Sequence, residues 1–225
     1  DSTVWVSEKL HGTNCSIQVL RGFSHPDLFG PKNNIAISSK GMAAKGLFLK
    51  NNETNKGNLY VKTVLKYLID TDLLTTLEQN YPTFDIISRV CIVGEIFGKG
   101  VQDLSYGVTE PTFNVFDIFV RHQKWENDVT VSSSFMAPLD MQTMQYFADV
   151  LGMSSVPVLY YGPFDIGEIT KLRDGKSVYA PDQIKEGIVI KADPVIYDSE
   201  LPNNRLALKY VSPDYLLRKG GTEYQ

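Results

Sequence analysis

The sequence is poor in cysteine, in histidine and in positive charge. Its 225 residues include two cysteines and three histidines, and the formal net charge is −4. Cys15 and Cys91 lie in apolar, strand-like runs without the Cys-x-x-Cys or Cys/His spacing of a metal site, so we interpret them as reduced core thiols of an intracellular protein. The acidic balance argues against a protein that coats polyanions in general. A phosphate-bearing partner would have to be bound by a few local cations.

Long apolar runs are also missing. No stretch approaches the roughly 18 residues needed to cross a bilayer, and the start "DSTVWVSEKL" lacks the charged-then-apolar layout of a signal peptide. We therefore expect a soluble protein with no membrane partner. A hydrophobic content of 43% over this length suits one domain, or one and a half, with a substantial core.

Short alternating runs dominate what is present. They predict strands at 14–20, 35–38, 90–97, 112–121, 156–161, 186–192 and 205–212. Three- and four-residue apolar spacing predicts one or two helices over 59–81, a helix over 138–152 that stops at Gly152, and a short helix over 164–175. Loops are expected at 22–34, 50–58, 98–111, 122–130 and 193–204. Strands outnumber helices without regular βαβ alternation, which indicates an α+β fold with mainly antiparallel sheets and flanking helices.

Ionisable side chains interrupt several of these apolar strands. They are Glu95, Asp117, Glu186, Lys191 and Lys209. Each could point outward from a one-sided antiparallel sheet. However, the two-residue period places Lys209 on one face with Ala207 and Val211, which do not make a solvated face. Charges kept from water must be paired, bind a metal or bind a charged ligand, and lysines with glutamates on apolar strands suit a site for phosphate and metal.

The segment "EKLHGTN", residues 8–14, places Lys9 where a β-leaning run ends in a turn, partly out of water. It resembles the Lys-x-(Asp or His)-Gly motif of covalent nucleotidyltransferases, the superfamily of ATP-dependent DNA ligases, RNA ligases and mRNA capping enzymes. Four later motifs match in chain order: "GE" at 94–95, "FNVFDI" at 113–118, "EGIVIK" at 186–191 and "ALKYVS" at 207–212. Histidine at the third motif position, followed by Gly-x-Asn, resembles the RNA ligase 2 type, which includes phage nick-sealing enzymes and trypanosome mitochondrial editing ligases.

The resemblance implies the nucleotidyltransferase fold over 1–225 and the activity of an ATP-dependent RNA ligase. Lys9 would attack the α-phosphorus of ATP, release pyrophosphate and form lysyl-AMP. The AMP would pass to an RNA 5′-phosphate, and a 3′-hydroxyl would displace it at a nick in duplexed RNA. The amine must first lose its proton, which desolvation, Lys191, Lys209 and Mg²⁺ are expected to favour.

The other roles are carried over by position. Phe116 would stack on adenine, and Val189 would line the opposite side of the purine. Glu95 would accept hydrogen bonds from the ribose hydroxyls. Lys191 and Lys209 would neutralise the α-phosphate, since electrostatics and positioning supply most of the catalysis in phosphoryl transfer.

The resemblance also implies a divalent cation, Mg²⁺ or Mn²⁺. Glu186 would orient its waters, with Glu95 and Asn14 as further contacts, through water in part, and Asn14 would also help to position phosphate. The residues beside the nucleophile, Glu8 and Leu10, complete the nucleotide-binding set. Glu186 and Lys191 are five residues apart, so strict alternation puts them on opposite faces, and Glu186 must lie at the start of its strand or a bulge must intervene.

Two positions depart from the family pattern. The strand after the nucleophile segment usually carries an arginine, but "AISSKGM" offers only Lys40, or Ser39 in a stricter register, and a lysine cannot grip an oxyanion bidentately. The final motif commonly carries two lysines, whereas this chain has Lys209 alone. The second cation is absent or comes from elsewhere, with Arg218 and Lys219 as candidates.

The same residues are compatible with other functions. The chain could be a DNA ligase or a capping nucleotidyltransferase, which normally have aspartate where this chain has His11, or a nucleotide-binding module with weakened catalysis. His11 itself could organise the turn or assist the leaving group. Residues 210–225 are too few for a C-terminal RNA-clamping domain, so binding of an RNA with 5′-phosphate and 3′-hydroxyl ends would depend on a further domain or a partner subunit.

Overall fold

The computed structural model describes residues 2–68, 72–80, 87–126, 129–132 and 136–220. The chain forms two compact units. Unit 1 contains Asp1–Thr13, Glu95–Thr112 and Val156–Gln225, and unit 2 contains Asn14–Gly94 and Phe113–Ser155. Each unit is therefore assembled from segments that are distant in the sequence.

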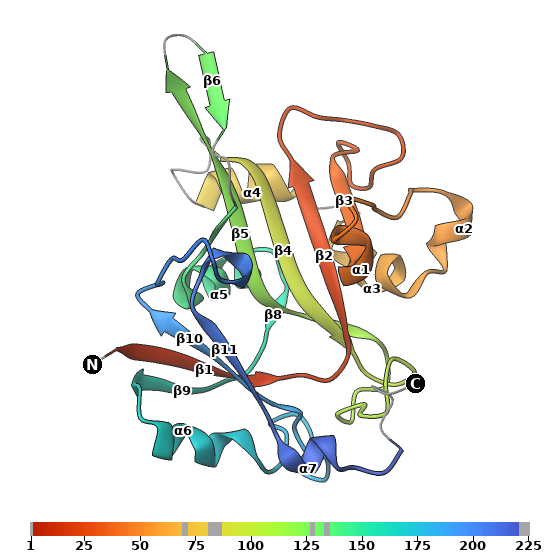
Figure 1. The fold of residues 1–225 in the computed structure, drawn as a ribbon. Coiled ribbons are helices and arrows are strands. Elements are labelled where there is room, and N and C mark those ends of the chain that lie inside the picture. Colours follow the sequence, from red (N-terminus) through yellow and green to blue (C-terminus); the bar gives the residue numbers. More distant parts are fainter. Residues whose placement is uncertain (1, 69–71, 81–86, 127–128, 133–135, 221–225) are drawn as a thin grey trace. The chain divides into compact units, whose positions relative to one another are not determined.

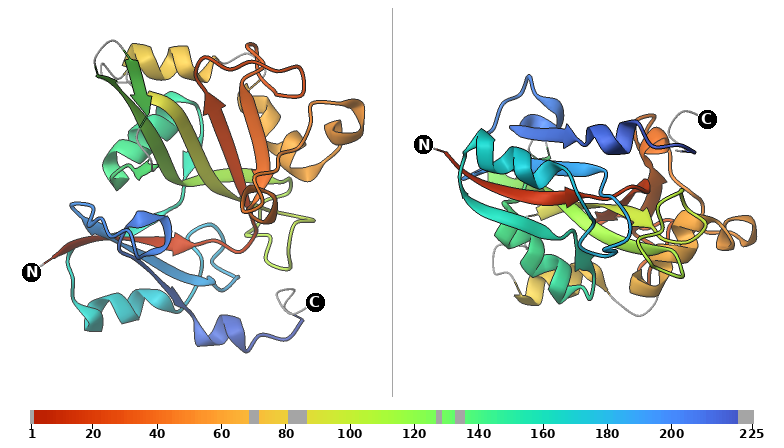
Figure 2. Two further views of the ribbon diagram at one scale, coloured as in Figure 1. Left: turned by 45° about the horizontal axis from the view of Figure 1, so that its top comes forward. Right: turned by 90° about the horizontal axis from the view of Figure 1, so that it is seen from below.

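Unit 1 is built on a four-stranded antiparallel sheet in the order β11-β10-β1-β9 (Figure 1). The strands are β1 (Thr3–Lys9), β9 (Val158–Pro163), β10 (Gly187–Asp193) and β11 (Ala207–Val211). The unit also contains the helices α6 (Ile166–Arg173) and α7 (Pro213–Leu216) and the 3-10 turn η2 (Pro202–Asn204). Helix α6 lies against β10, as two further views show (Figure 2).

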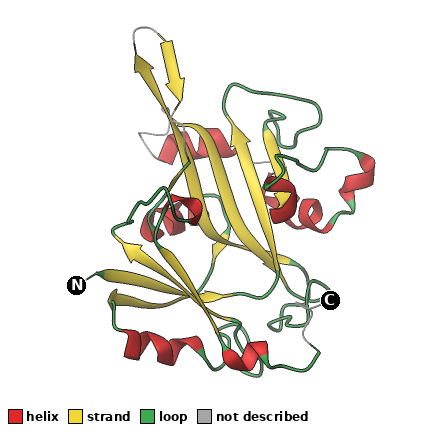
Figure 3. Cartoon of the chain, in the orientation of Figure 1, coloured by secondary structure: helices red, strands yellow, loops and turns green. Residues whose placement is uncertain are grey.

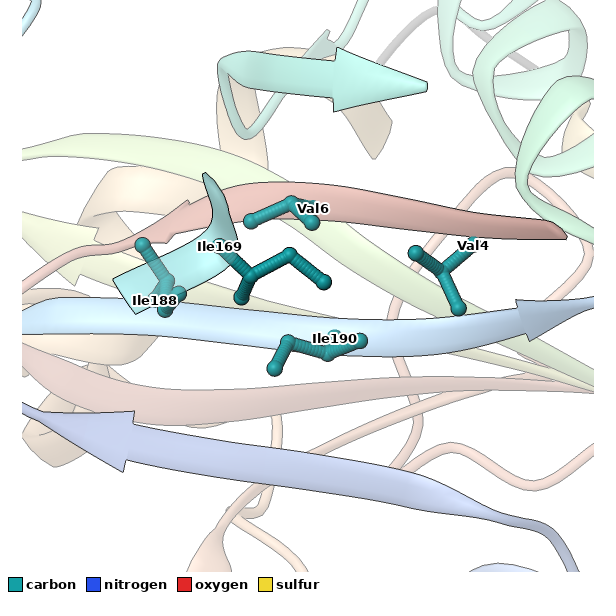
Figure 4. Packing of buried hydrophobic residues seen from close by; sticks show 5 residues of the cluster. All are labelled: Val4, Val6, Ile169, Ile188 and Ile190. Atoms are coloured by element: carbon teal, nitrogen blue, oxygen red, sulfur yellow. The ribbon is translucent and has the colours of Figure 1, made fainter. Parts of the chain in front are cut away.

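One face of this sheet forms the core of unit 1. Alternate residues of the two central strands, Val4 and Val6 of β1 and Ile188 and Ile190 of β10, are buried together. Ile169 of α6 reaches into the same cluster (Figure 4). Since successive side chains of a strand point to opposite faces, the residues between them are left for the other face of the sheet.

Unit 2 contains a larger sheet with the strand order β3-β2-β4-β5-β6, in which β7 and β8 also pair with β5. The strands are β2 (Thr13–Leu20), β3 (Ile35–Ser39), β4 (Ile87–Phe97), β5 (Thr112–Glu126), β6 (Val129–Ser132), β7 (Ala137–Pro138) and β8 (Ser154–Ser155). The helices are α1 (Lys40–Ala43), α2 (Glu53–Lys56), α3 (Leu59–Leu68), α4 (Leu73–Asn80) and α5 (Met141–Val150). Most of β2, β4 and β5 belongs to this unit, and the ends of these strands continue into unit 1.

The secondary structure confirms the α+β class and all seven strands that the sequence predicts, to within a few residues at their ends (Figure 3). The described part of the stretch 59–81 holds two helices, α3 and α4, and residues 69–71 and 81 lie outside it. Helix α5 begins after its N-cap Asp140, which accepts a hydrogen bond from Thr143 N–H. No helix in the described ranges is long and apolar enough to span a membrane.

Two expected loops are wrong in part. In the loop expected at 122–130, residues 122–126 belong to β5 and 129–130 to β6, while 127–128 lie outside the described residues, and the loop at 50–58 contains α2. Helices α1, α2 and α7 have four residues each, too few for an apolar period to show. The first two are marked instead by their N-caps, Ser39 and Asn52, because a cap side chain satisfies a free backbone N–H at the start of a helix.

Candidate functional site

Three lysines share one face of the unit 1 sheet. Lys9 is the last residue of β1 and lies opposite Gly187 of β10. Val189 of β10 lies between Ser7 of β1 and Lys209 of β11 in the register, while Lys191 lies opposite Trp5. Because paired residues of an antiparallel sheet point to the same face, Lys9, Lys191, Lys209 and Val189 all lie on the face opposite the apolar core.

The burial of the charged strand residues differs from one to the next. Lys191 is 7% exposed, and Glu186 and Asp117 are likewise buried, so an outward-facing position is wrong for these three. Glu95 is half-buried. Lys209 is exposed, which corrects the expectation that its neighbours keep it from water. The reason is that β11 is an edge strand of its sheet, which an apolar pattern alone does not reveal.

Glu186 lies immediately before β10 and forms an ion pair with Lys9. The alternation of side chains along β10 allowed either a position at the start of the strand or a bulge, and Glu186 lies at the start of the strand. Gly187 makes this start possible: its φ is +151°, and a Cβ there would lie 2.3 Å from the carbonyl oxygen of Tyr210. The Ser212 N–H also donates to the Glu186 carbonyl oxygen at 2.9 Å. The backbone therefore places Glu186 where its carboxylate can pair with the Nζ atom of Lys9.

Glu8 points away from this face. Its register partner is Ile188, a member of the apolar core, and the Glu8 side chain is buried. Its Oε2 accepts a hydrogen bond from Val178 N–H at 2.8 Å, and its Oε1 has no hydrogen-bond partner in the part of the chain described. Leu10 is buried as well. The predicted nucleotide contacts of these two residues would have to come from their backbone groups.

The turn after Lys9 packs closely on the end of β4. A Cβ at Gly12 would lie 2.1 Å from the carbonyl oxygen of Ile96 and 3.1 Å from Cγ of Glu95. The glycine of the motif is thus required by close approach of the backbone. The same contact brings Glu95 beside the turn that follows Lys9.

The Tyr106 hydroxyl bonds to the turn after Lys9. Its oxygen accepts a hydrogen bond from the backbone N–H of His11 at 2.8 Å. Burial raises the pKa of the Tyr106 hydroxyl, and the negative charges of Glu186, Glu8 and Glu95 raise it further. Glu186 and Glu95, two of the residues predicted from the motifs, therefore lie near the same buried group.

His11 is almost completely buried, at 2% exposed, and both of its ring nitrogens face protein groups. Nε2 lies 2.7 Å from Oδ1 of Asp103, and Nδ1 lies 2.7 Å from the hydroxyl of Tyr215. This arrangement favours a role in organising the turn over a role at the leaving group. Arg218 bonds to Asp103 at 2.8 Å, which raises the pKa of its guanidinium, so the structure commits this candidate second cation to an ion pair.

Unit 2 carries the remaining predicted residues. Asn14 is the second residue of β2 and is half-buried. Lys40 is exposed at the first position of α1, directly after the cap Ser39. Phe116 is half-buried in β5 between buried neighbours, so it is not an ordinary core residue. Their proximity to Lys9 stays a prediction.

The chemistry of the donors agrees with magnesium or manganese. Glu186 and Glu95 offer carboxylate oxygens, the ligands that these hard cations prefer. No group of three or more histidine, cysteine, aspartate or glutamate residues suited to a metal occurs within the described segments. A cation held here would complete its shell with phosphate oxygens and water, which is usual for Mg²⁺.

Sequence reasoning missed Asp103, Tyr106 and Tyr215. The first two lie in the expected loop 98–111, and Tyr215 lies in α7. Neither region has a periodic pattern or a motif of its own. Only the three-dimensional contacts with His11 reveal these residues.

The fold of the chain resembles that of solved RNA ligases. Solved structures of an RNA ligase from Naegleria gruberi match this chain, among them a lysine-to-alanine variant with ATP and Mn and a form with PPi, both at 16% identity and a TM-score of 0.60. A lysine-to-methionine variant with AMP and Mn matches at 16% identity and 0.59. These matches cover 96% of this chain and 50%, 51% and 51% of the others, so the chain spans about half the length of these proteins.

The family follows from the sequence itself. The model of the RNA ligase family matches residues 2–211, and the chain belongs to that family. Comparison with curated proteins finds no match.

Proposed function

We propose that this chain is the adenylyltransferase domain of an ATP-dependent RNA ligase. It forms lysyl-AMP on Lys9, transfers the AMP to an RNA 5′-phosphate and joins that end to a 3′-hydroxyl, at nicks in duplexed RNA. Family membership supports the activity. The observation that carries the proposal is the position of Lys9 at the end of β1, in contact with Glu186 and on the same face as Lys191 and Lys209.

Each residue has a defined part in the first step. The Lys9 nitrogen attacks the α-phosphorus, an N–P bond forms, and the bond to pyrophosphate breaks. The ammonium must lose a proton first, and the Glu186 carboxylate in contact with Nζ is the acceptor that the structure offers. Lys191 and Lys209 offset the negative charge that moves to the leaving group.

The metal and the nucleotide are placed by the remaining groups. Glu186 and Glu95 would hold a magnesium or manganese ion, with Asn14 as a further contact, and the ion neutralises phosphate charge when it is bound. Glu95 also accepts from the ribose hydroxyls, Phe116 stacks on adenine, and Val189 lines the other side of the purine. A further domain or a partner subunit supplies the clamp on the RNA duplex.

Covalent labelling tests the first step. The chain is incubated with ATP labelled at the α-phosphate and with Mg²⁺, and the products are separated on a denaturing gel. The wild type and the control Lys171→Ala, which removes an exposed lysine of α6, are expected to keep the label, whereas Lys9→Ala loses it. Label on Lys9→Ala at the wild-type level contradicts the assignment of the nucleophile.

Two further comparisons separate the alternatives. Labelling with GTP in place of ATP would indicate a capping enzyme, and sealing of nicked DNA in preference to nicked RNA would indicate a DNA ligase. ATP binding without covalent label would indicate a binding module, which the exposed Lys209 and the missing second lysine favour among the alternatives.

A further inference from the structure

The turn after Lys9 is bonded to a partly buried polar cluster that the adenylylation chemistry does not use: three of its members are buried, Asp103 is exposed and Arg218 is half-buried. We call it the His11 cluster, and it consists of His11, Asp103, Tyr106, Tyr215 and Arg218. Its members come from the turn after β1, from the segment 98–111 and from the segment after β11, all within unit 1. The side-chain bonds of His11 therefore join parts of the chain that are distant in sequence.

Both ring nitrogens of His11 have hydrogen-bond partners. An ionised carboxylate can only accept hydrogen bonds, so Nε2–H of His11 donates to Oδ1 of Asp103 across 2.7 Å. Nδ1 lies 2.7 Å from the Tyr215 hydroxyl, within hydrogen-bond distance. Neither ring nitrogen is left for a substrate. The His11 ring therefore links Asp103 to Tyr215.

Arg218 fixes both of those groups. Its Nε and Nη2 donate to the two oxygens of Asp103 at 2.8 and 3.1 Å, a bidentate pair. Its Nη1 donates to the carbonyl oxygen of Tyr215 at 2.6 Å, and its guanidinium lies 3.6 Å from the centre of the Tyr215 ring. Arg218 also pairs with the negative charge of Asp103.

The same segment of chain also reaches the other side of Lys9. The Ser212 N–H donates to the carbonyl oxygen of Glu186, and Tyr215 follows three residues later in α7. One short segment after β11, residues 212–218, therefore contacts both the turn that follows Lys9 and the residue that pairs with Lys9.

We propose that Asp103, Tyr215 and Arg218 are positioning residues for the nucleophile, and that they act through His11 to hold the turn in the geometry that presents Lys9. The inference rests on the proposed function of Lys9. It adds the segment 212–218 to the parts of the chain on which adenylylation depends, since small displacements of a reacting group lower rates strongly.

A double-mutant cycle tests whether the effect passes through His11. The rate of lysyl-AMP formation is measured in single turnover at saturating ATP for Tyr215→Phe, His11→Ala and the double variant. Removing the Tyr215 hydroxyl is expected to slow the wild type about tenfold and to change the His11→Ala rate by less than about twofold. Equal factors in both backgrounds would overturn the proposal, because Tyr215 would then act independently of His11.

A matched control separates positioning from a general loss of stability. Tyr146→Phe also removes a tyrosine hydroxyl, one that bonds to a carbonyl oxygen in unit 2 at 3.3 Å, and it is expected to label at the wild-type rate. Melting temperatures of all variants are recorded. A slow rate in Tyr215→Phe that is matched in Tyr146→Phe would also overturn the proposal.

Hydrogen exchange gives a readout that needs no activity. The amides of residues 10–13 are expected to exchange faster in Tyr215→Phe than in the wild type, while peptides of β10 stay unchanged. Unchanged exchange at 10–13 refutes the inference even if the chain is an active ligase. Faster exchange in a chain that never takes label keeps the inference about the turn and removes the proposed function.

Discussion

Replacing Gly12 with alanine tests whether the close packing of the motif turn on β4 sets the position of Lys9. The new Cβ would lie 2.1 Å from the Ile96 carbonyl oxygen and 2.9 Å from its carbon. An ordinary carbon–oxygen contact is about 3.3 Å or longer, so the turn has to move by about 1 Å. Because the atoms opposite are backbone, no side-chain rotation can relieve the clash.

The size of the effect follows from this displacement. Overpacking of this kind costs about 1–3 kcal/mol, which for a chain of this size lowers the melting temperature by about 2–4 °C per kcal/mol. A misplacement of about 1 Å at a reacting group lowers its rate about 100-fold. We therefore expect Gly12→Ala to fold with a reduced melting temperature and to form lysyl-AMP about 100-fold more slowly.

The assay is single-turnover labelling with ATP, accompanied by thermal unfolding of the same preparations. Gly57→Ala is the matched control, because Gly57 has an ordinary helical φ of −84° and a Cβ added to it would meet no atom of the described residues within 4 Å. This variant should label and melt like the wild type. If Gly12→Ala labels at the wild-type rate, the turn does not depend on this packing, and the geometric account of the site fails.

Three further predictions concern the core of unit 1, the stacking of Phe116 on adenine and the pH dependence of stability. Ile169→Ala, which empties a fully buried position between α6 and the sheet of unit 1, should lower the free energy of unfolding by about 2–5 kcal/mol in a denaturant titration; a loss below about 1 kcal/mol would contradict the assigned core. Phe116→Ala should raise the ATP concentration needed for half-maximal labelling about 5- to 150-fold, the equivalent of the 1–3 kcal/mol of one stacked base, and an unchanged ATP dependence would remove Phe116 from the site. Hydrogen bonds from Arg173 lower the pKa of Asp174, so the ionised carboxylate stabilises the fold above about pH 4, and this contribution is lost as the pH falls through the lower pKa of the folded state. In Asp174→Asn the melting temperature should therefore fall less steeply as the pH is lowered than in the wild type. An unaltered dependence of the melting temperature on pH would count against the pair.

The alternation of β10 shows how far local sequence reasoning reaches. It required Glu186 to lie at the start of the strand, or a bulge to intervene, if Lys191 faced the nucleotide, and the structure has Glu186 directly before Gly187. The reasoning succeeded because the direction of a side chain in a strand is a property of the local backbone. The same property placed Lys9, Lys191 and Lys209 on one face once the register was known.

Lys209 and Glu8 show where that reasoning stops. The neighbours of Lys209 are apolar, but among the described strands β11 has a partner on one side alone, so the residue is exposed. Glu8 flanks the nucleophile in sequence, but its carboxylate is directed to Val178, 170 residues away. Exposure and distant partners depend on which strands become neighbours, and a local pattern does not contain that information.

The sequence by itself determined the α+β class, seven of the strands and the residue types of the candidate site, because strand periodicity and the ordered motifs are encoded in short segments. The tertiary structure alone decided what surrounds them: the ion pair of Lys9 with Glu186, and the contacts of His11 with Asp103 and Tyr215, which are 92 and 204 residues away. The physical reason is that hydrogen bonds and ion pairs form between groups that packing brings together, and packing is a property of the whole chain.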